Sequence, residues 1–389
     1  KLCCIRYGVG LGMRMRIDGD ITNEVNSNRN KVLKYIDDKK KIDFEIRDHD
    51  LEYFQKNGLL SLVDSLLPVT REIENRKFLR ATKTKILDFH ILKLVKEFEN
   101  NDIKYIVFKG YAISKSLYSN SNDRPYADID LIIDPSQKNK VIKIFSELNY
   151  SNPFDRDYSF TRGQIVRRKE LTPHKIFIEL DIHFFMIGNF ILRNIYCFDE
   201  LYKEKQNIKV QDRTINTISK YHAFIHCCIH YYFHHKKRDL LKDIWLYDIK
   251  LRSEDMDPKD IKNLTFIINE IRLGMVVIEV LEVVNQKFKL KNDFILEINN
   301  NVDKNDDYYD LKNSNPLSIY LKQIIKIDKS SDRFKFVYDT IIPDYKLLSL
   351  KYGGFKRNLY PIFILLRFFD ITYDYGGRIV KNFWKTKSF

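Results

Sequence analysis

The sequence predicts an α+β protein, in which a small mixed sheet with two flanking helices is joined to a larger, mostly helical region. Three observations support this fold class. Apolar residues recur at helical spacing up to about residue 100. Short apolar runs typical of strands then alternate with helical segments as far as residue 183. Helical patterns dominate again from residue 191 onwards.

The composition limits the class of protein. A chain of 389 residues suggests two or three domains, and 27 Phe with 24 Tyr provide ample material for buried cores. No apolar run reaches the roughly 18 residues of a membrane-spanning helix, so we expect no membrane span. The five Cys include two adjacent pairs, which is not the pattern of a disulfide framework and favours a reducing, cytoplasmic setting. The net charge of +14 is spread along the chain, so nucleic acid is an open but not a favoured partner.

Residues 1–70 are predicted to form a helical extension. Apolar positions recur at helical spacing over residues 28–66, and Pro68 ends the pattern. A long helix is expected over residues 71–100, because its apolar residues repeat every three or four positions.

Residues 71–190 are predicted to form the core that contains the sheet. Apolar or alternating runs indicate strands, which we expect at residues 105–108, 127–133, 158–161, 164–169 and 175–183. Helices are expected over residues 111–118 and 135–148, and Pro135 suits the first turn of the second one.

Residues 191–389 are predicted to form a helical domain. Its strongest helical patterns cover residues 218–235, 240–251 and 260–285, and short helices follow Pro316. The polar run over residues 299–315 is expected to be a flexible linker.

The most informative motif is Asp128-Ile129-Asp130. In a strand, alternate side chains project to one face about 7 Å apart, so both carboxylates point the same way. Two such charges repel each other, and a divalent cation relieves the repulsion; Mg²⁺ favours carboxylate sites that also take substrate phosphates. The alternative is a pair of solvated carboxylates on an exposed face.

The surrounding sequence supports a phosphate and metal site. Lys109 and Gly110 stand between a predicted strand and a helix, where a glycine, a helix N-terminus and a lysine can receive phosphate. Arg124 lies four residues before Asp128 and can act in the same way. A later strand carries Glu179, Asp181 and His183 on one face, and a third carboxylate there would complete a two-metal site.

These motifs resemble those of a known family. Their order along the chain is Phe108-Lys109-Gly110, Arg124, Asp128-Ile129-Asp130-Leu131 and Asp181-Ile182-His183. This order is similar to that of nucleotidyltransferases of the DNA polymerase β superfamily. It is similar in particular to a bacterial branch whose members often accompany biosynthetic genes for peptide natural products or surface polysaccharides. The resemblance covers roughly residues 75–250, which makes residues 71–190 the expected catalytic core.

The resemblance implies a metal-dependent transfer of a nucleoside monophosphate from an NTP to a hydroxyl or phosphate of a small molecule, peptide natural product or saccharide, with release of pyrophosphate. It implies that Gly110 belongs to the nucleotide loop and that Asp128 and Asp130 hold two Mg²⁺ ions. Asp181 is the preferred third carboxylate, expected to help deprotonate the acceptor, and Glu179 is the second choice. One departure is Tyr111, which stands where the wider superfamily has Ser or Gly.

A row of histidines follows in a predicted helix. His226, His230 and His234 are spaced so that they line one helix face over about 12 Å, too far for all three to bind one ion. The sequence allows three roles for these histidines. Two of them could bind zinc, one or more could lie beside the active site, or all could be packed in the core. The resembled branch has a recurring His in this helix and an Asp in the next, which correspond to His230 and Asp248. We expect these two residues to form an ion pair that braces the helical domain.

Two alternatives to the enzyme remain. A catalytically silent protein of the same fold would bind a nucleotide or a partner, and the Tyr111 departure favours it. An RNA-directed transferase or toxin is supported only by the charge of +14.

Overall fold

A six-stranded mixed sheet forms the centre of the computed structural model, which describes residues 29–171, 176–234, 242–312, 314 and 316–369. The strands are β1 Tyr105–Phe108, β2 Ile129–Ile133, β3 Gln164–Leu171, β4 Ile176–His183, β5 Gln206–Val210 and β6 Arg213–Thr217. Their order is β3-β4-β2-β1-β6-β5, with β2 parallel to β4, β1 parallel to β6 and the other neighbours antiparallel. The predicted fold class is therefore confirmed.

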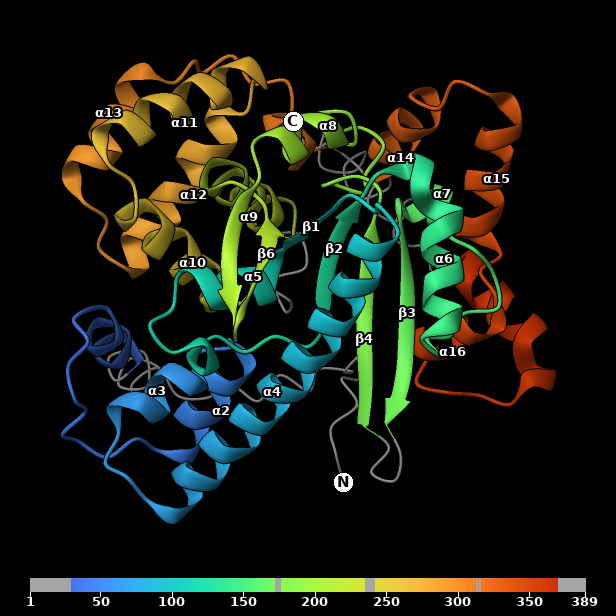
Figure 1. Ribbon diagram of the computed structural model, residues 1–389. Helices are drawn as coiled ribbons and strands as arrows, with labels where there is room; N and C mark the ends of the chain where they lie inside the picture. The colour runs from blue at the N-terminus through green and yellow to red at the C-terminus, as the bar shows by residue number, and fades with distance from the viewer. Residues whose placement is uncertain (1–28, 172–175, 235–241, 313, 315, 370–389) are drawn as a thin grey trace, which may run out of the picture.

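Helices surround this sheet and make up most of the described chain (Figure 1). They are α2 Asp48–Lys56, α3 Leu60–Leu66, α4 Arg71–Asn100, α5 Lys109–Ser116, α6 Lys138–Glu147, α7 Ser159–Arg162, α8 Phe198–Lys203, α9 Lys220–His234, α10 Asp243–Glu254, α11 Pro258–Glu270, α12 Gly274–Lys287, α13 Asn292–Asn301, α14 Pro316–Ile325, α15 Ser330–Ile341 and α16 Tyr345–Lys351. Further helical residues span 29–37 and 360–369. Among the described residues, no helix combines the length and apolarity needed to cross a bilayer.

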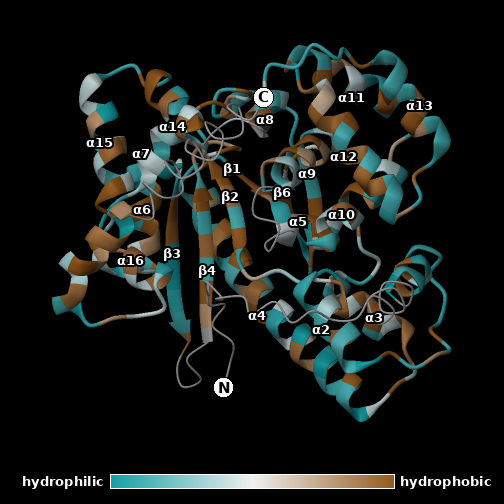
Figure 2. Ribbon diagram, turned by 180° about the vertical axis from the view of Figure 1, so that it is seen from behind, coloured by the Kyte–Doolittle hydropathy of each residue, from teal (hydrophilic) through white to brown (hydrophobic). Residues whose placement is uncertain are grey.

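The two faces of the sheet pack into two different hydrophobic cores. On β1, Tyr105 and Val107 join a core with α4 and α6, whereas Ile106 and Phe108 join a core with α9, α10 and α12. This alternation follows the period of two in a strand. Figure 2 shows the resulting hydrophobic residues along the central strands. Asp130 lies on the same face of the sheet as Ile106 and Phe108. This is the face that is turned toward α9.

The N-terminal helices share the second core. Val32, Phe54 and Val63 are buried in one cluster with residues of α9 to α13. Strands β5 and β6 extend the sheet although they follow residue 190. The division of the chain at residues 70 and 190 stays a prediction.

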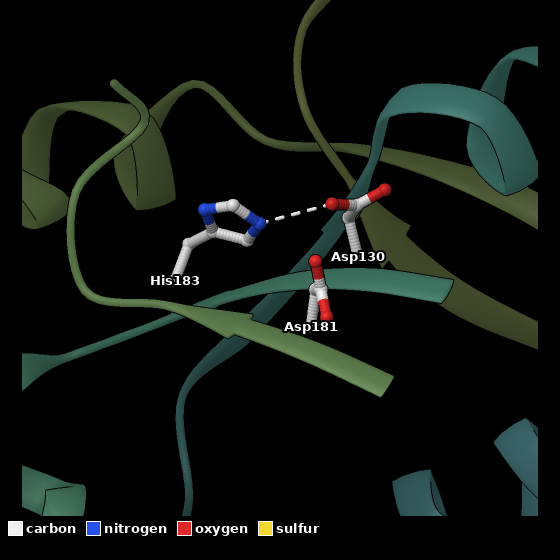
Figure 3. A group of neighbouring side chains, drawn as sticks. All are labelled: Asp130, Asp181 and His183. Atoms are coloured by element: carbon white, nitrogen blue, oxygen red, sulfur yellow. Dashed lines mark hydrogen bonds and ion pairs between the residues drawn. The ribbon is translucent and has the colours of Figure 1, made fainter. Parts of the chain in front are cut away.

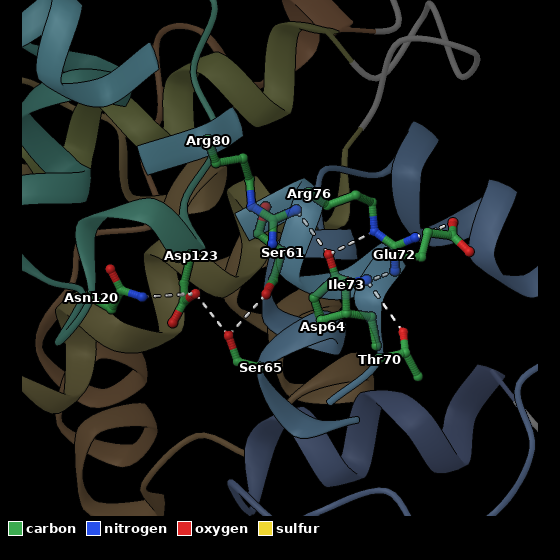
Figure 4. Close-up of polar contacts among 10 residues, drawn as sticks. All are labelled: Ser61, Asp64, Ser65, Thr70, Glu72, Ile73, Arg76, Arg80, Asn120 and Asp123. Carbon is green, nitrogen blue, oxygen red and sulfur yellow. Dashed lines mark hydrogen bonds and ion pairs between the residues drawn. The ribbon is translucent and has the colours of Figure 1, made fainter. Parts of the chain in front are cut away.

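A buried ion pair joins α3 to α4 and lies close to the loop before β2 (Figure 4). The fully buried Asp64 carboxylate accepts hydrogen bonds from Arg76 Nη2 at 2.6 Å and Arg80 Nη1 at 2.8 Å. Ser65 next to it donates to Asp123 at 2.8 Å, so α3 also holds the loop that leads to Arg124. Two arginines compensate the desolvated carboxylate, as a buried charge requires.

The structure differs from the sequence expectations at four places. Residues 158–161 are not a strand, because Ser159–Arg162 forms α7. The hairpin of β5 and β6 was missed, since its turn residue with positive φ is Gln211 and not the Gly or Asn that marks such turns. The helix expected over 260–285 breaks after Glu270, where Arg272 adopts φ 54°.

The fourth concerns residues 299–315, which are not a free linker where the structure describes them. Residues 299–301 complete α13, and Val302 and Leu311 are buried. Asp306 accepts hydrogen bonds from the backbone N–H of Val276 at 3.0 Å and of Tyr308 at 2.7 Å.

Candidate metal and nucleotide site

Lys109 lies at the junction between β1 and α5, and its side chain reaches residues on one face of the sheet. The strand β1 ends at Phe108, as expected, whereas α5 begins at Lys109, two residues before the helix expected over residues 111–118. Lys109 has φ 55°, a conformation that residues other than glycine rarely adopt. Its Nζ donates a 2.7 Å hydrogen bond to Asp130 Oδ1 and lies 3.1 Å from His183 Nε2. The ammonium therefore lies beside the carboxylate on β2.

Asp130, Asp181 and His183 meet on two neighbouring parallel strands. In the ladder of β2 and β4, Asp130 lies opposite Asp181 and Ile132 lies opposite His183. One ligand atom from each of the three side chains lies within 4.8 Å of the others. Figure 3 shows them converging, with His183 Nε2 2.9 Å from Asp130 Oδ1. The shared strand face predicted from the sequence is confirmed for these three residues.

Positive charge keeps Asp130 ionised. Burial alone would raise the pKa of Asp130, but the Lys109 ammonium and the hydrogen bond with His183 outweigh it and hold the pKa well below its usual range. Burial, together with the Lys109 charge, lowers the pKa of His183 to about 4. His183 is therefore a neutral imidazole at pH 7, the form that can bind a metal.

The pKa of Asp181 is shifted in the opposite direction from that of Asp130. Burial and the neighbouring carboxylates of Asp130 and Asp128 raise the pKa of Asp181 to about 8. Its Oδ2 accepts a 3.3 Å hydrogen bond from Gln164, whereas its buried Oδ1 has no hydrogen-bond partner among the described residues. A buried, unpartnered carboxylate oxygen beside a second carboxylate suits a hard divalent cation. The two carboxylates therefore suit a divalent cation.

The two other candidate carboxylates lie at the edge of this group. Asp128 occupies a bend just before β2, and burial and the charge of Asp130 raise its pKa to about 6. Its charge acts on Asp181, but it is not part of the three-residue ligand group. Glu179 accepts hydrogen bonds from Arg168, with Nε at 3.0 Å, so a cation already holds it.

Arg124 takes part in an ion pair that the sequence did not predict, and Gly110 leaves space for it. The Arg124 guanidinium forms a buried ion pair with Asp248 on α10, with Nη2 2.8 Å from Oδ2. Tyr118 also donates to Asp248, at 2.7 Å. A Cβ on Gly110 would lie 2.5 Å from Arg124 Nη1, so the glycine makes room for this guanidinium. Phosphate binding by Arg124 stays a prediction.

The histidine row begins beside the carboxylates. The Phe108 ring lies 5.0 Å from the ring of His183 and 5.4 Å from that of His226, centroid to centroid. Burial and the Lys109 charge lower the pKa of His226 to about 3. His230 stacks on His226 and His234 and meets Trp245 edge-on at 4.3 Å.

The expected ion pair between His230 and Asp248 is wrong. Within the described part of the chain, Asp248 contacts Arg124 and Tyr118, and no ion pair joins it to His230. The reason is that Arg124 supplies a permanent charge at this buried position, whereas burial lowers the pKa of His230 well below its usual value.

Tyr111 does not face the carboxylates. Its side chain is fully buried in the core shared with α4, and its hydroxyl donates to Asp88 Oδ1 at 2.8 Å. Lys115 donates to the other oxygen of Asp88 at 2.7 Å. The residue that departs from the superfamily pattern is thus a core residue.

Sequence reasoning missed two lysines near Asp128. Lys83 on α4 donates to the backbone oxygen of Tyr126 at 3.0 Å, and Lys242 precedes α10. Burial lowers the pKa of each, and the charge of Asp128 acts in the opposite direction. No motif marks them, because both are remote from Asp128 in the sequence.

Replacing Asp181 by Asn is expected to stabilise the metal-free protein at alkaline pH. Folding raises the pKa of this carboxyl from 3.8 to about 8, so the folded chain keeps a proton that the unfolded chain loses. The free energy of unfolding of the wild type should therefore fall as the pH rises between these values, and Asp181→Asn should remove this decline, a gain on the order of 3 kcal/mol at pH 8. Denaturant unfolding in EDTA from pH 5 to 8 measures it. Parallel profiles for both proteins would contradict the prediction, and the exposed Glu147→Gln is the control.

The fold and the site together define an α+β protein in which two carboxylates and a histidine lie close together on one sheet face. Residues 51–289 match the family described as uncharacterised nucleotidyltransferase, and because this is more than half of the chain, the chain belongs to that family. The nucleotidyltransferase class predicted from the sequence is thereby confirmed.

Among solved structures, the chain is similar to an antigenic nucleotidyltransferase-like protein from Paracoccidioides brasiliensis. The two share 13% identity at a TM-score of 0.37, over 56% of this chain and 93% of that chain. No curated protein matches the chain.

Proposed function

We propose that the protein is a metal-dependent nucleotidyltransferase of the DNA polymerase β type, acting in the cytoplasm. It moves a nucleoside monophosphate from an NTP to a hydroxyl or phosphate of a small molecule, peptide natural product or saccharide and releases pyrophosphate. The observation that carries this proposal is that Asp130 and Asp181 lie opposite each other on adjacent strands. The buried Oδ1 of Asp181 has no hydrogen-bond partner among the described residues. Membership in a nucleotidyltransferase family supports it.

Each residue of the site has a role in this proposal. Asp130, Asp181 and Asp128 would hold two divalent ions, which supply charge neutralisation for the leaving pyrophosphate and activation of the acceptor. His183 orients Asp130 through their 2.9 Å contact. Asp181 is the carboxylate proposed to take the proton of the acceptor, since it lies opposite Asp130 on the neighbouring strand.

The proposal is tested with the purified full chain, NTPs labelled at the α-phosphate, Mg²⁺ and host extract. We expect transfer of the label to an acceptor with release of pyrophosphate, and no transfer in EDTA. Label in RNA would identify the RNA-directed alternative. Failure to incorporate label from any NTP, with either Mg²⁺ or Mn²⁺, would overturn the proposal.

Replacing Lys109 by Met is expected to separate metal binding from nucleotide binding. The Lys109 ammonium competes with a cation for Asp130, so Mn²⁺ should bind more tightly without it. Binding of NTP should weaken about tenfold, because the lysine can no longer reach the phosphates. Titration calorimetry with Mn²⁺ alone and with NTP measures both effects. Unchanged NTP affinity would assign Lys109 a structural role, and the exposed Lys96→Met on α4 is the control.

The contact between Lys109 and Asp130 also favours a second candidate, a catalytically silent protein that binds a nucleotide. In such a protein the ammonium replaces the metal as the partner of the carboxylate. Stabilisation by NTP that does not depend on Mg²⁺ and yields no pyrophosphate would support this candidate.

A further inference from the structure

Arg162 is the last residue of α7 and lies two residues before a side chain that contacts Asp181. Gly163 turns the chain with φ 69°, and β3 begins at Gln164 (Figure 1). Gln164 lies opposite His183 in the ladder of β3 and β4, and it donates to Asp181 Oδ2 at 3.3 Å. The end of α7 therefore adjoins the candidate site from the side of β3.

The Arg162 guanidinium is held by aromatic rings and not by an acidic group. Its Cζ lies 5.3 Å from the centroid of the Tyr158 ring and 5.7 Å from that of Phe154, and the residue is exposed. Across the described residues, no ion pair or hydrogen bond engages its side chain. Contact with aromatic rings uses none of the five N–H donors of a guanidinium, so these donors remain available to a ligand.

The acidic residues on the helices beside α7 have other partners. Asp339 on α15 accepts a 2.6 Å hydrogen bond from Thr161, and Asp344 accepts one from the backbone at the start of α16. Burial lowers the pKa of Arg162, whereas the charges of Asp344 and Asp181 act in the opposite direction. Arg162 is thus close enough to Asp181 for their charges to interact, although no contact joins them.

The order of the strands places Arg162 and Lys109 on opposite sides of the carboxylates. The sheet runs β3-β4-β2-β1. Lys109 follows β1 and contacts Asp130 on β2, whereas Arg162 precedes β3, which borders Asp181 on β4. In the proposed reaction, Lys109 meets the phosphates of the NTP and Asp181 meets the acceptor. The side of the site where the acceptor would bind therefore carries a cation that pairs with no described residue.

We propose that Arg162 binds an oxyanion of the acceptor, so that the acceptor carries a phosphate or a carboxylate group. This inference rests on the proposed transfer reaction and deepens it by naming the chemical class of the acceptor. A planar guanidinium receives either group through two parallel hydrogen bonds. Its charge also offsets the repulsion that an anionic acceptor would meet from the carboxylates of the site.

Fractionation of the acceptor tests its chemical class. A host extract treated with ribonuclease is passed over an anion exchanger, and the flow-through and the retained fraction are each assayed with the full chain, labelled NTP and Mg²⁺. We expect transfer with the retained fraction alone. Treatment of that fraction with alkaline phosphatase, which is then inactivated, distinguishes the two groups. Loss of transfer identifies phosphate, whereas survival indicates a carboxylate.

Replacing Arg162 by Gln tests the residue. The KM for the retained acceptor fraction should rise about tenfold or more, whereas the KM for NTP should not change. Arg162→Lys should recover part of the affinity, because it restores the charge but not the planar pair of donors. The melting temperature should stay at the wild-type value, since Arg162 is exposed and has no ion pair among the described residues. Arg71→Gln, at the exposed first residue of α4, is the matched control.

The outcomes separate this inference from the proposed function. Transfer with the flow-through as efficient as with the retained fraction would overturn the inference and leave the proposed function intact. An unchanged acceptor KM in Arg162→Gln would do the same, and so would a rise in the KM for NTP, because the NTP phosphates would then lie at Arg162. Absence of transfer with every fraction would contradict the proposed function, and the inference would fail with it.

Discussion

Replacing Asp130 by Asn is expected to lower the rate of nucleotidyl transfer by about a hundredfold or more, a loss of about 3 kcal/mol of transition-state stabilisation. Asn keeps the shape of the side chain but removes one negative charge from the proposed metal site. The stabilisation of the protein by Mg²⁺ with NTP should disappear with the activity. Transfer assays and melting temperatures with and without Mg²⁺ and NTP measure the two effects together.

The metal-free Asp130→Asn protein should also be less stable than the wild type, by roughly 1–3 kcal/mol. Relief of repulsion between Asp128 and Asp130, considered alone, would predict that this variant keeps or even gains stability. The structure supports the opposite sign, because Asp130 is the ion-pair partner of Lys109 and its pKa lies well below its usual range. Asp181→Asn, in contrast, should lose activity and gain stability.

Glu179→Gln is the matched control for this experiment. Glu179 lies on the same strand face but is paired with Arg168, so most of the activity should remain. If Mg²⁺ with NTP stabilises Asp130→Asn as strongly as the wild type, the two-metal mechanism is wrong. If Glu179→Gln loses as much activity as Asp181→Asn, the third carboxylate has been assigned to the wrong residue.

Replacing Asp248 by Asn is expected to destabilise the fold by about 3–5 kcal/mol. The change leaves the buried guanidinium of Arg124 without its counter-charge, although Tyr118 can still donate to the remaining side-chain oxygen. Equilibrium denaturation gives the free energy of unfolding. The second change Arg124→Met should recover part of the loss, because it removes the unpaired charge.

Asp255→Asn provides the control for Asp248→Asn. Asp255 follows the same helix and also pairs with an arginine, Arg252, but its carboxylate is half exposed. An exposed ion pair contributes at most about 1 kcal/mol, so the control should lose little stability. Equal losses in the two variants would show that burial does not set the strength of the Arg124–Asp248 pair.

Strand β4 illustrates how far the candidate site could be predicted. Alternation alone placed Glu179, Asp181 and His183 on one face, but it left two choices for the third carboxylate. The register of the sheet separates them. Arg168 lies opposite Glu179 in the ladder with β3, whereas Val166 lies opposite Asp181. Glu179 therefore receives a cation and Asp181 does not.

The sequence by itself determined the α+β class, the long helix Arg71–Asn100 and the sheet face that carries Asp130, because hydrophobic period and strand parity are local properties. Only the tertiary structure decided which charges meet. Arg124 and Asp248 are 124 residues apart, and Lys109 reaches Asp130 and His183 from a third element. An ion pair depends on distance and desolvation, and both are set by the packing of elements that are remote in the sequence.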